Sequence, residues 1–176
     1  MIERFLVRNF FPEKEEILVS EFAEFANFFP ITILEGEYAG ETFRIPVIYT
    51  FFEGSQAESR YFATDEYAGD FSFHVKGEKF RPSFDNRALV ITDEYRQFLD
   101  ESLMTFARMK SSRGWPLSFP PAPRWLQADD TPMSAKGRPL QFICQLELAG
   151  LVDDDCMMYV FLNPETGSVR TVYQRD

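Results

Sequence analysis

The residues best suited to binding chemistry follow a proline-rich stretch. Trp125 and Gln127 lie directly after it, and Gln145 lies within a later alternating apolar run. An aromatic face beside amide groups can line a small pocket, because an amide both donates and accepts hydrogen bonds. The same groups can instead clamp the proline-broken chain, since the alternation points Gln145 away from the main core and toward the 125–127 backbone. We favour the clamp, and the pocket is the alternative.

Two acidic clusters are the second set of candidate site residues, and they are Asp129-Asp130 and Asp153-Asp154-Asp155. Carboxylates bind hard cations, but an EF-hand loop needs alternating acids and a central glycine, which both clusters lack. A pair of carboxylates can also hydrolyse glycosides, and only their spacing in three dimensions would reveal it. We interpret both clusters as solvated loops or as an electrostatic docking surface.

The common catalytic sets are missing from the sequence. The one histidine, His74, alternates with Phe71 and Phe73 and falls on the opposite face of a strand, with no nucleophile placed near it. One histidine and two separated cysteines cannot supply the roughly four ligands of a structural zinc site. Neither glycine-rich phosphate-binding motif occurs. We therefore predict no cofactor and no metal, and we lean away from an enzyme.

The net charge of the chain limits the kinds of partner that it can bind. The 176 residues carry a formal net charge of -10, so nucleic acids and anionic membranes would be repelled. There is no secretory leader pattern and no apolar run near the ~20 residues of a membrane helix, so we expect one cytoplasmic domain over 1–176. Cys144 and Cys156 fall in apolar runs, which predicts that both are buried and reduced.

The elements that must position these residues are mostly strands. Periodicity predicts an α+β fold with a mainly antiparallel sheet and one or two packed helices, at about 15–29 and 93–110. The second helix carries an apolar stripe that should pack on a sheet. Pro46 marks its strand as an edge or as the site of a bulge. The predicted strands cover 5–11, 31–34, 43–51, 71–75, 88–91, 140–148, 157–162 and 169–173. The tetrapeptide Glu-Tyr-Ala-Gly occurs at 37–40 and again at 66–69, and we interpret it as two similar turns.

Several of these residues also match a pattern in a known family. The matching positions are Pro123-x-Trp125-Leu126-Gln127, Pro132, Gly137, Leu140, Phe142-Ile143-x-Gln145-Leu146 and Tyr159-Val160-Phe161. Residues 123–174 thereby resemble the YwqG-like family of bacterial proteins of unknown function. The resemblance implies a mixed α+β fold dominated by antiparallel sheet, and it implies no established activity. Many relatives have Cys-x-x-Cys before the glycine, where this chain has Met133 and Lys136, so that pair's metal or redox role is absent.

The sequence thus favours a non-catalytic acidic binding protein that docks a basic protein partner. Because some relatives resemble neighbours of bacterial toxin systems, the resemblance adds an immunity or toxin-neutralising role. The alternative is a small-ligand-binding protein or a hydrolase-type enzyme that uses a pocket around Trp125, Gln127 and Gln145. A third hypothesis is an assembly subunit, which would expose an apolar patch near Phe51-Phe52 or Phe10-Phe11. The partner and the oligomeric state are not predicted.

Overall fold

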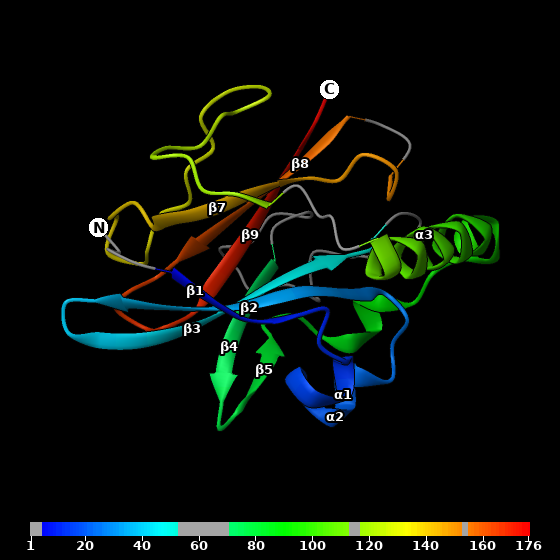
Figure 1. The fold of residues 1–176 in the computed structure, drawn as a ribbon, viewed down its shortest axis with the longest axis horizontal. Coiled ribbons are helices and arrows are strands. Elements are labelled where there is room, and N and C mark those ends of the chain that lie inside the picture. Colours follow the sequence, from blue (N-terminus) through cyan, green and yellow to red (C-terminus); the bar gives the residue numbers. More distant parts are fainter. Residues whose placement is uncertain (1–4, 53–70, 113–116, 153–154) are drawn as a thin grey trace.

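Two antiparallel sheets form the protein, and a computed structural model describes residues 5–52, 71–112, 117–152 and 155–176 (Figure 1). The three-stranded sheet has the order β1-β2-β3, and the six-stranded sheet has the order β5-β4-β9-β8-β7-β6. This confirms the α+β fold with mainly antiparallel strands. The strands are β1 (Phe5–Phe10), β2 (Phe28–Tyr38), β3 (Glu41–Thr50), β4 (Phe71–Lys76), β5 (Lys79–Pro82), β6 (Leu117–Ser118), β7 (Gln141–Glu147), β8 (Cys156–Leu162) and β9 (Val169–Arg175).

The three-stranded sheet is the middle layer. β2 and β3 are buried on both faces over most of their length, whereas β1 is largely exposed. One face packs against β7, β8 and β9 around Ile45, Val47 and Val160, and these residues belong to the main core. The other face carries Phe28 and Ile48, which pack against β4, β5 and two short N-terminal helices. In Figure 1 the β4–β5 hairpin and those helices lie below this sheet, and β7 to β9 lie above it. Burial on both faces explains why the pattern in β2 is almost continuously apolar.

The six-stranded sheet packs on both faces of the three-stranded sheet, because β7, β8 and β9 lie on one face, and β4 and β5 lie on the other. The two parts are joined where β9, which pairs with β8 along its length, also pairs with β4 at Phe71–Phe73. The Arg44 guanidinium of β3 donates to the Glu78 carbonyl, at 2.7 Å, in the turn between β4 and β5. β3 is an edge strand of its own sheet, which confirms the interpretation of Pro46, since an edge position needs no second ladder partner.

The long helix α3 (Asp93–Ser112) confirms the second helix prediction. Its buried residues Leu99 and Phe106 lie in the main core. The Phe106 ring meets Phe29 of β2 edge-on at 5.2 Å, and it meets Phe11 at 5.7 Å. The apolar stripe therefore packs on the three-stranded sheet, as its spacing indicated.

The first predicted helix is wrong as a single element over 15–29. The structure has two four-residue helices, α1 (Lys14–Ile17) and α2 (Ser20–Ala23), and β2 has already begun at Phe28. The break falls at Leu18 and Val19, both with extended backbone. Leu18 forms a parallel bridge to Phe80 of β5, and the Val19 N–H donates to the Phe80 carbonyl at 3.0 Å. Pairing with β5 thus overrides the local helical spacing.

A second correction concerns residues 88–91, predicted as a strand. They fall on a 3-10 helix, Asn86–Leu89, and on the short connection that follows it. The Asp85 carboxylate accepts a hydrogen bond from the Arg87 N–H at 2.9 Å and stabilises the first turn. Ala88 and Leu89 are buried as expected for an apolar run. A short apolar run fits a strand or a buried turn equally well, so periodicity could not separate them.

The tetrapeptide at 37–40 forms the turn between β2 and β3, as interpreted. Ala39 and Gly40 have positive φ values of 52° and 82°. Two consecutive residues with positive φ are typical of the tight hairpin turn whose twist matches its strands. The second copy, at 66–69, lies outside the described residues.

Cys144 and Cys156 are both buried, and neither forms a disulfide bond, as predicted. Burial raises the pKa of the Cys144 thiol far above its usual range, which suppresses the reactive thiolate. We expect a thiol reagent to label neither cysteine in the folded protein at neutral pH and to label both in denaturant. Rapid modification of either thiol in the folded protein would contradict this burial, and mass spectrometry of the labelled chain measures it.

Candidate functional site

The segment containing Trp125 covers the outer face of the six-stranded sheet. The Trp125 ring lies 4.4 Å from the Tyr159 ring and stacks on Phe161 at 5.9 Å and 16°. With Leu140 and Val172 these rings form a separate small apolar cluster. In Figure 1 the loop that follows β6 passes above β7 and β8, on the side opposite the three-stranded sheet. Trp125 therefore holds an irregular segment onto the sheet.

A bulge in β7 decides which of its side chains reach this outer face. The pairing with β8 shifts between Phe142 and Cys144, so Ile143 is an extra residue. The sequence placed Phe142 and Cys144 on one face. Instead Phe142 packs in the outer cluster, and Cys144 lies in the main core. Gln145, one residue later, points to the outer face, so its predicted direction is confirmed.

Gln145 and Tyr159 bind the backbone of this segment. The Gln145 Oε1 accepts from the Arg124 N–H at 2.8 Å. The Tyr159 hydroxyl accepts from the Leu126 N–H at 3.1 Å and donates to the Arg124 carbonyl at 2.8 Å. Burial raises the pKa of the Tyr159 phenol, so it keeps the proton with which it donates. Both side chains therefore replace hydrogen bonds that an irregular, proline-broken backbone cannot make with itself.

Gln174 of β9 is the third amide in this arrangement, and sequence reasoning missed it. Its Oε1 accepts from the N–H groups of Leu126, at 3.0 Å, and Gln127, at 3.1 Å, and its Nε2 donates to the Ala128 carbonyl at 2.7 Å. The side chain is only 5% exposed. An amide alternating with buried residues in Val172-x-Gln174 was the available signal, because a buried amide needs backbone partners.

The geometry is that of a clamp. Gln145 and Gln174 bind the chain's own backbone, and Gln127 uses its Nε2 to donate to the Arg175 carbonyl at 2.6 Å. Of these amides, Gln127 and Gln145 are the two that the alternative hypothesis assigned to a ligand pocket. Because the clamp already uses them, a ligand at Trp125 would have to displace protein hydrogen bonds.

The clamp fixes one of the two acidic clusters. Asp129 follows the clamped residues directly, and its Oδ1 accepts from the Thr131 hydroxyl at 2.7 Å and from the Thr131 N–H at 3.0 Å. These two bonds, the hydroxyl's first, lower the pKa of the Asp129 carboxyl below its usual range. Asp130 is exposed. The loop therefore presents the carboxylates of Asp129 and Asp130 from a defined backbone.

The other cluster lies partly outside the described residues, which exclude Asp153 and Asp154. Asp155 is exposed, and its carbonyl accepts from the Asp176 N–H at 3.0 Å. Since Gln127 binds the neighbouring Arg175, the structure brings the Asp129 loop, Asp155 and the end of β9 to one side of the molecule. We call Asp129, Asp130, Asp155 and Asp176, all of which are exposed, the acidic surface.

Within the described residues, no group of three or more His, Cys, Asp and Glu is arranged to hold a metal ion. His74 lies exposed on β4, on the face that the alternation indicated. In the same part of the chain, no helix combines the length and apolar character needed to cross a membrane.

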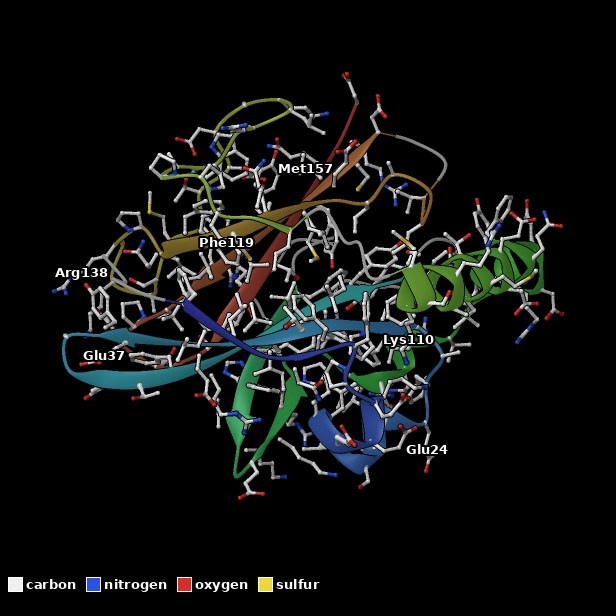
Figure 2. All side chains as sticks on the ribbon, in the orientation of Figure 1. Glu24, Glu37, Lys110, Phe119, Arg138 and Met157 are labelled. Carbon is white, nitrogen blue, oxygen red and sulfur yellow. The ribbon has the colours of Figure 1, made fainter. Side chains whose placement is uncertain are left out.

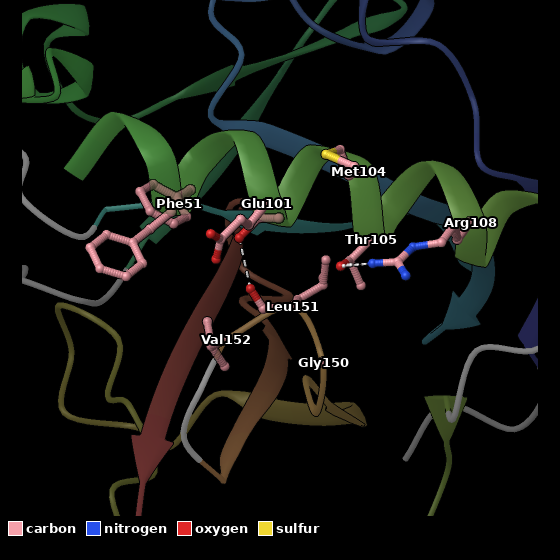
Figure 3. A pocket seen from close by; sticks show the side chains of 10 residues that line it. Phe51, Glu101, Met104, Thr105, Arg108, Gly150, Leu151 and Val152 are labelled. Carbon is pink, nitrogen blue, oxygen red and sulfur yellow. Dashed lines mark hydrogen bonds between the residues drawn. The ribbon is translucent and has the colours of Figure 1, made fainter.

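A surface cavity of about 290 Å³ lies between α3 and the turn that joins β7 to β8 (Figure 3). Its lining includes Glu101, Thr105 and Arg108 of the helix, with Gly150 and Leu151 of the turn. Sequence analysis did not find it, because its two walls are about 45 residues apart and neither carries a motif. The glycine, at φ 86°, was the available signal for a tight turn at this point.

Comparisons with protein-family models, curated proteins and solved structures returned no match for this chain. The function must therefore be argued from the clamp, the acidic surface and the cavity.

Replacing Trp125 with alanine should destabilise the protein. The half-buried ring packs on Tyr159 and Phe161, so the loss should fall toward the lower end of the ~3–5 kcal/mol typical of a buried aromatic. Thermal melts of the variant and the wild type measure it. A Trp125→Ala protein that melts within a degree or two of the wild type would overturn the clamp.

Replacing Gln174 with leucine tests the amide itself. The change keeps the bulk, but it removes the partners of the Gln127 N–H and the Ala128 carbonyl, at a cost of about 1–2 kcal/mol. Gln145→Leu should act in the same direction. Gln97→Leu, at an exposed position of α3, is the matched control and should be near neutral. Urea unfolding measures all three, and equal losses for Gln174 and Gln97 would contradict the assigned role.

Proposed function

We propose that this protein is a non-catalytic binding protein whose acidic surface docks a basic protein partner. A role in neutralising a toxin is one form of this proposal, and it rests on the resemblance to the YwqG-like family, which we also put forward as a proposal. The residues that carry the resemblance include Trp125 and Gln145, whose contacts in this structure are structural. These contacts indicate that Trp125 and Gln145 stabilise the fold, and they give no support for a catalytic activity.

The observation that carries the proposal is the clamp behind Asp129 and Asp130. Backbone groups on the N-terminal side of this loop are bound by Gln145, Tyr159 and Gln174. A surface held in one conformation loses less conformational entropy on binding than a free loop would. The chain therefore maintains a defined backbone beneath the carboxylates of Asp129 and Asp130.

Charge supplies the attraction. The net charge is -10, and the lowered pKa of Asp129 keeps its charge as the pH falls toward the usual aspartate range. A field of this sign accelerates encounter with a basic protein, and salt screens it. Binding should therefore weaken as ionic strength rises.

We expect neutralisation of the acidic surface to weaken partner capture. The test compares wild-type protein with a variant carrying Asp129→Asn, Asp130→Asn and Asp155→Asn, each used as bait in lysate of the native host at low salt. The bound protein should be basic, should elute with increasing salt and should be depleted by the variant. The control carries Glu16→Gln and Glu24→Gln, two exposed acids near α1 and α2; Figure 2 shows Glu24 on the side away from Met157 of β8. A partner that binds wild type and the Asp variant equally contradicts this surface.

A second candidate function is an assembly subunit, supported by one observation. Leu6 and Phe10 of β1 are 60% and 57% exposed on the edge strand of the three-stranded sheet, whereas Phe51 is buried. Exposed apolar residues on an edge strand favour pairing with another chain. Light scattering should then give a multiple of the 20.5 kDa chain mass that Phe10→Lys reduces. A monomer at all concentrations would rule this candidate out.

A further inference from the structure

The cavity beside α3 has a buried apolar floor and a charged rim. Phe51, Leu151 and Val152 form the floor, with exposed fractions of 1%, 3% and 8%. Glu101 and Arg108 lie on the rim, and both are exposed. Figure 3 shows the helix residues along one wall and the 150–152 turn along the other. A hollow with an apolar floor and a polar, charged border resembles an anchor site in a protein interface.

The two walls are fixed to each other before anything binds. The buried Ser102 hydroxyl of α3 donates to the Leu151 carbonyl at 2.8 Å, across 49 residues of chain. The Leu151 N–H is bound in turn to the Leu148 carbonyl at 2.9 Å. A Cβ at Gly150 would lie 4.0 Å from the Thr105 methyl, which shows how closely the turn approaches the helix. The hollow is therefore part of the folded state, and filling it requires no rearrangement of its walls.

Size restricts the occupant. A volume of about 290 Å³ lies just below the ~300–1,000 Å³ typical of sites for drug-sized ligands, and it suits one large apolar side chain with the backbone that carries it. Met104, which also lines the cavity, is 67% exposed. A flexible thioether at the rim adapts to the shape of an inserted side chain.

Charge restricts the occupant further. Glu101 and Arg108 are separated by two helical turns, about 10 Å along the axis, so the rim is negative at one end and positive at the other. The 150–152 turn also leads, three residues later, to Asp155 of the acidic surface. A basic residue beside the apolar anchor would thus meet Glu101, and a second one at the Arg108 end would be repelled. This asymmetry gives the occupant a direction.

We propose that this cavity is the anchor site for the basic partner, and that it receives one large apolar side chain whose neighbouring lysine or arginine pairs with Glu101. The inference rests on the proposed function, because it takes the sign of the partner from the acidic surface. It adds that recognition is amphipathic: carboxylates attract the partner, and the cavity selects the apolar residue that it presents.

Two capped synthetic peptides test the site directly with ¹⁵N-labelled protein. One has a single lysine next to a leucine, and the other has glycine in place of the leucine. The leucine peptide should shift the amide signals of Thr105, Gly150 and Leu151 in a saturable way. Its affinity should be at least about tenfold above that of the glycine peptide, because burial of a leucine side chain supplies that difference.

Matched variants locate the binding in the cavity. Thr105→Phe fills the hollow and should reduce the leucine peptide to the affinity of the glycine peptide. Ala107→Phe adds the same ring at an exposed position of α3 outside the lining, and it should leave binding unchanged. Glu101→Gln keeps the shape of the site and should weaken the leucine peptide several-fold, so it decides the question even where the Thr105 variant does not fold.

The outcomes separate this inference from the proposed function. If both peptides bind equally and shift only amides near Asp129 and Asp130, the anchor site is wrong and the acidic surface stands. If neither peptide binds at low salt, attraction of basic partners is itself wrong, and the anchor falls with it. Leucine-peptide binding that is insensitive to Glu101→Gln and to salt would show an apolar site with no preference for a basic partner, which also overturns the inference.

Discussion

The outer face of β7, β8 and β9 carries large apolar side chains that must be shielded from water, and the 124–131 segment and its acidic loop depend on how the chain shields them. Tyr159, Phe161 and Val172 lie on this face, and each is less than 1% exposed. A helix or a further strand would cover them with its backbone already hydrogen-bonded. This chain uses an irregular segment after a proline-rich stretch, whose buried N–H and C=O groups need partners from elsewhere. Gln145, Tyr159 and Gln174 supply those partners from the sheet itself.

The hydrogen bonds from Gln145, Tyr159 and Gln174 also determine how the loop at Asp129 and Asp130 is held at the surface. Aspartates in a free loop would be solvated and mobile, and a partner would have to order them. Here Asp129 follows a backbone bound at Leu126, Gln127 and Ala128, and it closes its own turn onto Thr131. Covering the sheet and presenting the carboxylates are therefore two results of one set of hydrogen bonds. The proposed recognition surface would therefore depend on the same hydrogen bonds that stabilise the sheet's cover.

The cavity beside α3 arises from a different constraint. The helix covers one end of the main core through Leu99 and Phe106, and Ser102 fixes the turn after β7 to it. The helix and the turn contact each other at the Ser102–Leu151 hydrogen bond, and the surface cavity lies between them. The result is a hollow with an apolar floor, bordered by Glu101 and Arg108.

Local sequence determined the elements whose pattern and tertiary role agree. The helix α3, the strand β3 and the β8–β9 hairpin could all be predicted as elements. The helix buries the stripe that its periodicity defines, whereas β3 is buried on both faces from Ile45 onward, which its alternation did not indicate. The contact of Gln145 with the Trp125 segment was also predictable, since a buried amide beside a proline-broken backbone has few other partners.

Only the tertiary structure decided the rest, because partners remote in the chain overrode the local pattern. Leu18 and Val19 would continue a helix by spacing alone, but Phe80 of β5 draws them into an extended pairing. The bulge at Ile143 moved Phe142, which precedes it, to the outer face and left Cys144 in the main core, and no residue type announces such a shift. Gln174 joined the clamp across 46 residues or more, and the cavity joined walls that share no motif. Periodicity encodes which face a residue occupies, whereas register and long-range pairing depend on the competing free energies of the whole chain.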